Sequence, residues 1–289
     1  MPYLYLILSV FMSASTSVFG KIFNIKNSGK RDTSTLYTFS LMISVFLGWS
    51  ILYATDVSFD AGVLLYSALF AICYLTCNIG IINAIQFGPT AITSLLINLS
   101  LIVTTIWGFI FWDASFSPTI LIGLILVVVA IVLCLYSKEK DKKAISLKWL
   151  IYVSLAFFGN AGCTIVQRTQ QMRYNGQHGN MLMLFATGAC VIAYVILYLR
   201  SDKRDTKSIL KASWWVPLCA GICNVALNVL VMLLAGTDLS PSLIYPVIGV
   251  GGLAVVTVFS LLVFKEKMRW WQWIGIAAGA AAVVLLSVG

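Results

Sequence analysis

Charge is the scarcest property of this 289-residue chain. Lysine, arginine, aspartate and glutamate together make up 10% of it, whereas apolar residues make up 60%. A soluble domain of this length cannot bury so much apolar surface, so the composition excludes an ordinary globular protein. A helical membrane protein has no such limit, because lipid surrounds its helices and each helix needs about 20 apolar residues to cross the bilayer.

Acidic residues are few, and none of them falls near the middle of a long apolar run. A carrier that exchanges protons for an organic cation usually needs a carboxylate inside the membrane to bind each of them in turn. The sequence therefore argues against proton-coupled antiport of polyaromatic cations. The ten acidic residues are Asp32, Asp56, Asp60, Asp113, Glu139, Asp141, Asp202, Asp205, Asp238 and Glu266.

Residues that carry out catalysis or bind metals are also scarce. His178 is the only histidine, and all seven cysteines lie inside apolar runs. An odd number of cysteines with none in a loop does not suit a disulfide framework, and cysteine pairs without histidine or carboxylate partners do not suit a metal site. We find no nucleophile–base pair, no phosphate-binding glycine loop and no catalytic carboxylate pair. The sequence predicts no enzymatic activity, no cofactor and no metal.

Long apolar runs are abundant. We expect an all-α integral membrane protein with ten transmembrane helices. A charged loop separates the first five from the last five and divides the chain into a first repeat (1–137), a linker (138–146) and a second repeat (147–289). Because five is odd, the second repeat must enter the membrane from the opposite side, which gives two inverted five-helix repeats. The expected helices are 3–23, 35–54, 62–86, 90–111, 118–137, 147–170, 180–199, 213–236, 241–264 and 270–288.

The ends of the two halves have matching motifs. Each has a proline that opens an apolar run, an acidic residue in the turn that follows, and glycine in the closing run. These are Pro89, Asp113 and Gly123 in the first half and Pro241, Glu266 and Gly275 in the second. The third helix of each half also carries the pattern Cys-x-x-x-Cys-Asn, ending at Asn78 and Asn224. The agreement indicates an internal duplication.

These motifs resemble those of the drug/metabolite transporter superfamily, specifically its EamA-type members. In that family each repeat typically ends in a proline-opened helix, a short acidic turn and a glycine-bearing helix. Lys21 and Arg168 also match the basic residue that closes the first helix of each family repeat. The resemblance implies ten helices in two inverted repeats, a transport function and a location in the bacterial cytoplasmic (inner) membrane.

Basic residues predict the orientation of the chain. All but two of the 19 lysines and arginines fall in the four loops that follow the first, fifth, seventh and ninth expected helices. The positive-inside rule places these loops in the cytoplasm and both termini outside it. Members of the resembled family usually have cytoplasmic termini, so the expected orientation departs from theirs. The net charge of +9 indicates contact with anionic lipid headgroups and not with nucleic acid.

Amide side chains within the apolar runs are the main candidates for substrate binding. An unpaired amide is costly in hydrocarbon, so each should face protein or a water-filled cavity. We expect a central polar cavity for a neutral or zwitterionic solute, and the alternative role for each amide is a hydrogen bond between helices. The candidates are Asn78, Asn98, Asn160, Gln167, Asn224 and Asn228.

Aromatic residues allow a second kind of site. Tyr74, Trp107 and Tyr245 lie inside expected helices and could form a cage around a quaternary ammonium group. The other tryptophans lie near helix ends and are expected to form interfacial belts. They are Trp49, Trp112, Trp149, Trp214, Trp215, Trp270, Trp271 and Trp273.

The sequence therefore predicts a secondary transporter for a small polar organic metabolite, with amino acids and their analogues first, working by alternating access. A carrier of quaternary amines or drug cations is the alternative within transport. A membrane sensor or lipid-handling protein is the alternative outside it. We expect a monomer. The small-residue face formed by Gly275 and Gly279 on the last helix offers a route to a homodimer.

Overall fold

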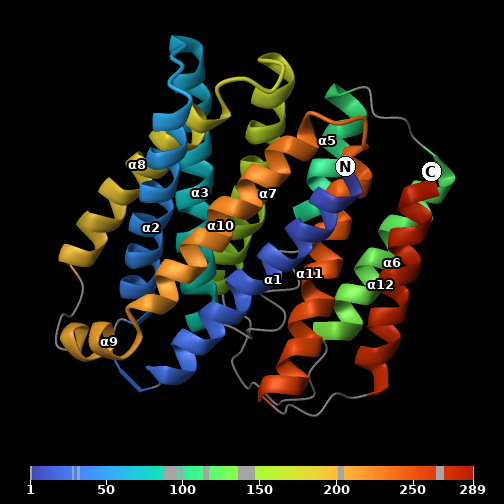
Figure 1. Ribbon diagram of the computed structural model, residues 1–289. Helices are drawn as coiled ribbons and strands as arrows, with labels where there is room; N and C mark the ends of the chain where they lie inside the picture. Colours follow the sequence, from blue (N-terminus) through green and yellow to red (C-terminus); the bar gives the residue numbers. More distant parts are fainter. Residues whose placement is uncertain are drawn as a thin grey trace.

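The computed structural model describes residues 2–27, 29–30, 33–87, 97, 100–112, 117–135, 147–200, 205–264 and 270–288. Every regular element within these ranges is an α-helix, so the expected all-α fold is confirmed there. The helices are α1 (Pro2–Lys26), α2 (Thr33–Thr55), α3 (Ala61–Phe87), α5 (Ser100–Phe111), α6 (Pro118–Leu135), α7 (Leu147–Arg173), α8 (Gly179–Leu199), α9 (Thr206–Ser213), α10 (Trp215–Ala235), α11 (Pro241–Phe264) and α12 (Trp270–Val288) (Figure 1).

Most expected helices agree with the observed bounds within three residues, and 241–264 agrees at both ends. The largest difference is α9, a short helix that the sequence reading assigned to a loop. It is followed by a turn at Trp214, and α10 begins only at Trp215. Eight residues with two lysines carry too little apolar sequence to be recognised as a membrane helix. Of the expected helix 90–111, residues 90–96 and 98–99 lie outside the described residues.

The lipid-facing surface accounts for the apolar composition. Within the described ranges, six helices are long and apolar enough to cross a membrane, namely α1, α2, α3, α7, α8 and α10, and shorter apolar stretches occur at 118–130, 243–252 and 273–282. Many large apolar side chains, such as Ile51, Phe158 and Leu262, are exposed on the outside of the molecule. Water would not tolerate so much exposed apolar surface, but lipid does.

The helices pack in a pattern that repeats when the two halves are exchanged. α1 packs against α10 and α11, as α7 packs against α3 and α5. α2 packs against α10 as α8 packs against α3, while α2 pairs with α8 and α6 pairs with α12. α1 and α7 run in opposite directions through the molecule (Figure 1). Two inverted repeats related by a twofold axis would produce this pattern. The repeat boundaries at 137 and 147 stay a prediction.

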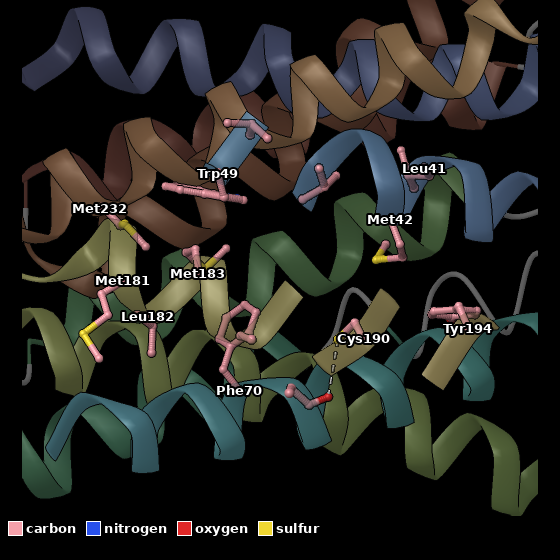
Figure 2. Packing of buried hydrophobic residues seen from close by; sticks show 14 of the residues in the cluster. Leu41, Met42, Trp49, Phe70, Met181, Leu182, Met183, Cys190, Tyr194 and Met232 are labelled. Carbon is pink, nitrogen blue, oxygen red and sulfur yellow. Dashed lines mark hydrogen bonds between the residues drawn. The ribbon is translucent and has the colours of Figure 1, made fainter. Parts of the chain in front are cut away.

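The two largest apolar cores lie on opposite sides of the molecule. The first joins α2, α3, α8 and α10 around Trp49 and Phe70, with the consecutive residues Met181, Leu182 and Met183 of α8 (Figure 2). The second joins α1, α6, α10, α11 and α12 around Leu6, Ile120 and Ile244.

The tryptophans fulfil the belt expectation only in part. Trp214, Trp270 and Trp273 are exposed near helix ends. Trp49 is 0% exposed, and Trp149 is buried as well, so the belt interpretation was wrong for these two. Trp49 lies in the first core (Figure 2), where its large ring fills space among the methionines. Proximity to a helix end gave no information about which side of the helix faces lipid.

The crossing of α3 and α7 brings two backbones unusually close. A Cβ atom on Gly159 would lie 2.7 Å from Cys73 O and 2.7 Å from Cys77 N. On the other helix, a Cβ atom on Gly80 would lie 2.6 Å from Ala156 N. Each helix therefore contributes a glycine that permits the approach of the other backbone.

The small-residue face of α12 packs inside the molecule. Gly275 and Gly279 are both buried. A Cβ atom on Gly279 would collide with Val250 of α11 and would also touch Ala130 of α6. This face is therefore covered by helices of the same chain.

Candidate functional site

A polar cavity of about 280 Å³ lies where the two apolar cores meet. Phe70 from the first core and Tyr245 from the second both line it. Its walls come from α1, α3, α7, α10 and α11. The lining residues are Ser13, Phe70, Tyr74, Cys77, Asn160, Cys163, Thr164, Gln167, Asn224, Leu227, Asn228, Val231, Tyr245, Ile248 and Gly249.

Six of the nine candidate residues meet in this cavity: Tyr74, Asn160, Gln167, Asn224, Asn228 and Tyr245. Asn78 is not among the lining residues, and its amide donates to Tyr74 O of its own helix at 2.8 Å. Trp107 lies elsewhere, 37% exposed and packed against Phe111 with ring centroids 4.2 Å apart. Asn98 lies outside the described residues.

The amides that line the cavity use their hydrogen bonds in three different ways. Asn160 Nδ2 donates to Ser100 Oγ at 2.7 Å and so joins α7 to α5. Asn228 Nδ2 donates to Asn224 O at 2.9 Å and to Asn224 Oδ1 at 3.2 Å, within α10. Gln167 is only 5% exposed, and its Nε2 has no acceptor among the described residues. Only Asn160 thus fits the alternative role of linking two helices.

The aromatic side of the cavity differs from the expected cage. Phe70 and Tyr74 stack with ring centroids 5.7 Å apart, and Tyr245 belongs to the opposite wall. Phe70 takes the place that the sequence interpretation gave to Trp107. An apolar residue in an apolar helix gave no signal that could have identified it.

Glycines in α11 have two separate roles. Gly249 lines the cavity. A Cβ atom on Gly251 would lie 2.9 Å from Val10 Cγ2, and one on Gly252 would lie 3.2 Å from Ser13 Oγ, so these two permit close packing of α1. Neighbouring glycines of one helix thus differ in role, one lining the cavity and two allowing another helix to approach.

A wider cavity of about 590 Å³ lies beyond the first, at the end that carries the α2–α3 and α7–α8 turns. Asp56, Ser58, Gln171, His178 and Met232 are among its lining residues. His178 Nδ1 lies 2.8 Å from Ser58 Oγ and ties the two turns together. We call this cavity the vestibule and the 280 Å³ cavity the central cavity.

These features define a class: a multi-pass helical membrane protein with a polar cavity enclosed between two halves of similar packing. The sequence model of the EamA-like transporter family matches residues 1–136 and 146–288. The chain belongs to the EamA-like transporter family, and the resemblance inferred from its motifs is confirmed. It is therefore a membrane transporter of the drug/metabolite transporter type.

One curated protein and one solved structure are similar to most of this chain. An uncharacterized protein of Haemophilus influenzae is 21% identical over 206 residues, which cover 71% of this chain and 68% of the relative. A protein crystal structure matches 99% of this chain and 97% of its own with a TM-score of 0.71 and 10% identity. The structural likeness supports the fold and carries no information about the substrate.

Proposed function

We propose that this protein is a secondary transporter of a small polar organic metabolite, with amino acids and their analogues as the first class to test. The central cavity carries the proposal, because amides, hydroxyls and phenols line it and none of the described residues that line it is acidic. Its volume of about 280 Å³ lies just below the range of about 300–1,000 Å³ usual for ligand pockets, which favours a metabolite over a bulky drug.

Alternating access follows from the symmetry of the packing. The central cavity lies between helices of both halves, so tilting one half against the other would open it first to one side and then to the other. We assign the two halves to residues 1–137 and 147–289. The protein works as a monomer in this proposal, because α6 and α11 already cover the small-residue face of α12.

A cation carrier is the alternative within transport. Phe70, Tyr74 and Tyr245 could offer aromatic faces to a quaternary ammonium group. None of the described residues that line the cavity is a carboxylate that could balance the charge, so the aromatic rings and neutral oxygens would have to compensate the loss of hydration.

One observation favours a lipid-handling role as the candidate outside transport. An open groove of about 490 Å³ lies between α3 and α7, with Leu150, Ile151, Leu155 and Phe158 on its walls. The groove is mostly apolar and suits a lipid acyl chain better than a polar solute.

A thermal-stability screen of the purified protein against polar metabolites distinguishes these functions. A ligand that binds only the folded protein raises its stability by RT ln(1 + [L]/Kd), about 2.7 kcal/mol at one hundred times Kd. We expect amino acids or their analogues to raise the melting temperature, and uptake of the same solutes by proteoliposomes. Stabilisation by quaternary amines alone supports the cation carrier, and stabilisation by lipids alone supports the lipid-handling role.

Cysteine labelling tests the proposed orientation. Val57 is 72% exposed in the α2–α3 turn, and Lys211 is exposed on α9 at the opposite end. With both termini outside the cytoplasm, Val57→Cys should react with a membrane-impermeant maleimide on intact cells, whereas Lys211→Cys should react only after lysis. The parent protein reports the background from the native cysteines. The reverse labelling pattern would show that the chain has the opposite orientation.

A further inference from the structure

Arg168 is a buried cation that the central cavity does not by itself explain. A basic residue near the end of a membrane helix commonly extends its side chain to the membrane surface. Arg168 is instead only 9% exposed. Its Nη1 donates to Ala235 O, in the last turn of α10. Its Nε has no acceptor among the described residues.

Arg168 lies on α7 between the residues that line the central cavity and those that line the vestibule. Thr164, one turn before it on the same face of α7, lines the central cavity, and Gln171, one turn after it, lines the vestibule. Ala235 has the same relation on α10, since Val231 lines the central cavity and Gly236 lines the vestibule. Along α7 and α10, the hydrogen bond between Arg168 and Ala235 therefore lies between the residues that line the two cavities, although Arg168 itself is a lining residue of neither.

The charge of Arg168 is only partly compensated. Within the described ranges it forms no ion pair with a carboxylate, and the phenol of Tyr245, which interacts with it electrostatically and lines the central cavity, carries no charge to balance it. The C-terminal end of α10 offers about half an elementary charge of the right sign. A buried cation normally needs a full partner, and the remaining N–H groups of the planar guanidinium match a carboxylate.

The side-chain amide of the preceding residue, Gln167, also has a donor without an acceptor in the described part of the chain. Gln167 is buried, its Nε2 lacks an acceptor among the described residues, and it lines the central cavity. Two adjacent residues of α7 thus hold buried donors that lack acceptors among the described residues, and Gln167 is the one that lines the central cavity. A solute with acceptor oxygens and a negative charge would complete both sets of hydrogen bonds.

We propose that Arg168, with Gln167 beside it, binds the carboxylate of the transported solute at the vestibule end of the central cavity. The assignment rests on the proposed transport function and restricts its substrate class to carboxylates, amino acids among them. In the free protein Ala235 O holds the guanidinium in place. The structural alternative is that Arg168 only caps the C-terminal end of α10.

The test compares matched acids and amides as stabilising ligands of the full-length protein. The probes are the standard L-amino acids with their carboxamides, and acetate, lactate and succinate with theirs. We expect at least one acid to stabilise the parent protein more than its amide does. Arg168→Gln should remove this preference and weaken acid binding about tenfold or more, as expected when a charged hydrogen bond is lost. Arg168→Lys should keep the preference with weaker binding.

Arg173→Gln is the matched control, because Arg173 lies on the same helix but is exposed; it should leave the preference unchanged. An acid preference that persists in Arg168→Gln overturns the assignment and leaves the capping role. If Arg168→Gln does not fold, an unchanged acid affinity in Arg168→Lys overturns it. Binding of neutral solutes without any carboxylate hit overturns it while leaving the transport function intact. The absence of any polar ligand overturns both.

Discussion

The Asn224→Leu variant should reach the membrane in normal amounts and fail to transport. Asn224 lines the central cavity from α10, and its side-chain oxygen Oδ1 accepts from Asn228 Nδ2 at 3.2 Å. Leucine has a similar size but neither donates nor accepts. It therefore removes one of the two acceptors of Asn228 Nδ2, the other being the backbone oxygen of residue 224, and leaves polar groups of the solute without a partner. A site that recognises its solute by hydrogen bonds binds it much more weakly when one partner is removed. We therefore expect the transport rate to fall by about a hundredfold or more.

Asn83→Leu is the matched control for this result. Asn83 lies on α3, donates to Ile79 O of its own helix at 2.8 Å, and is not a lining residue of the central cavity. The measurement is solute uptake by proteoliposomes that contain equal amounts of each protein. Transport at the parent rate by Asn224→Leu would remove α10 from the binding site, and an equal loss in both variants would point to a general effect of leucine on folding.

The second large effect concerns the crossing of α3 and α7. Gly159→Ala should destabilise the protein, and Gly159→Leu should not accumulate in folded form. The new Cβ atom would meet backbone atoms of α3 at 2.7 Å, and backbone cannot rotate away as a flexible side chain can. Overpacking of this kind typically costs about 1–3 kcal/mol for a single added group.

Gly20→Ala provides the control. Its Cβ atom would lie 3.5 Å from Tyr37 Oη of α2, an ordinary van der Waals contact with a side chain, and alanine favours a helix over glycine. We expect its melting temperature in detergent to equal or exceed that of the parent protein, while that of Gly159→Ala is lower. Equal melting temperatures for the two variants would show that α3 and α7 can separate without loss of stability.

The sequence predicted the helices well, because membrane helices are set by the length of an apolar run. It located the candidate site less completely. An amide in an apolar run has to be accommodated somewhere, which is why Asn160, Asn224 and Asn228 were found. The azimuth of each helix is set by packing between distant segments, and no local pattern reports it. Asn78 and Trp107 have residue types that suit a binding site, but neither of them lines the central cavity.

Arg168 illustrates the same limit for charge. From the sequence, a basic residue five positions before the end of a helix could extend to the surface or turn inward. The choice depends on whether another helix ends beside it, and here α10 ends at Ala235, whose carbonyl accepts from the guanidinium. That neighbour is 67 residues away in the chain, so only the folded structure could reveal the buried cation.

The packing of α1 has a consequence for the order of events during synthesis. Its main neighbours, α10 and α11, belong to the other half, so α1 enters the membrane long before its packing partners are made. Until those partners are made, α1 is surrounded by lipid, although it carries several hydroxyl groups. Two of these are already satisfied within the helix: Ser9 Oγ donates to Tyr5 O at 2.8 Å and Thr16 Oγ1 donates to Met12 O at 3.0 Å. With these two hydroxyls bonded to its own backbone, the first helix exposes fewer unsatisfied polar groups to lipid until the last helices arrive.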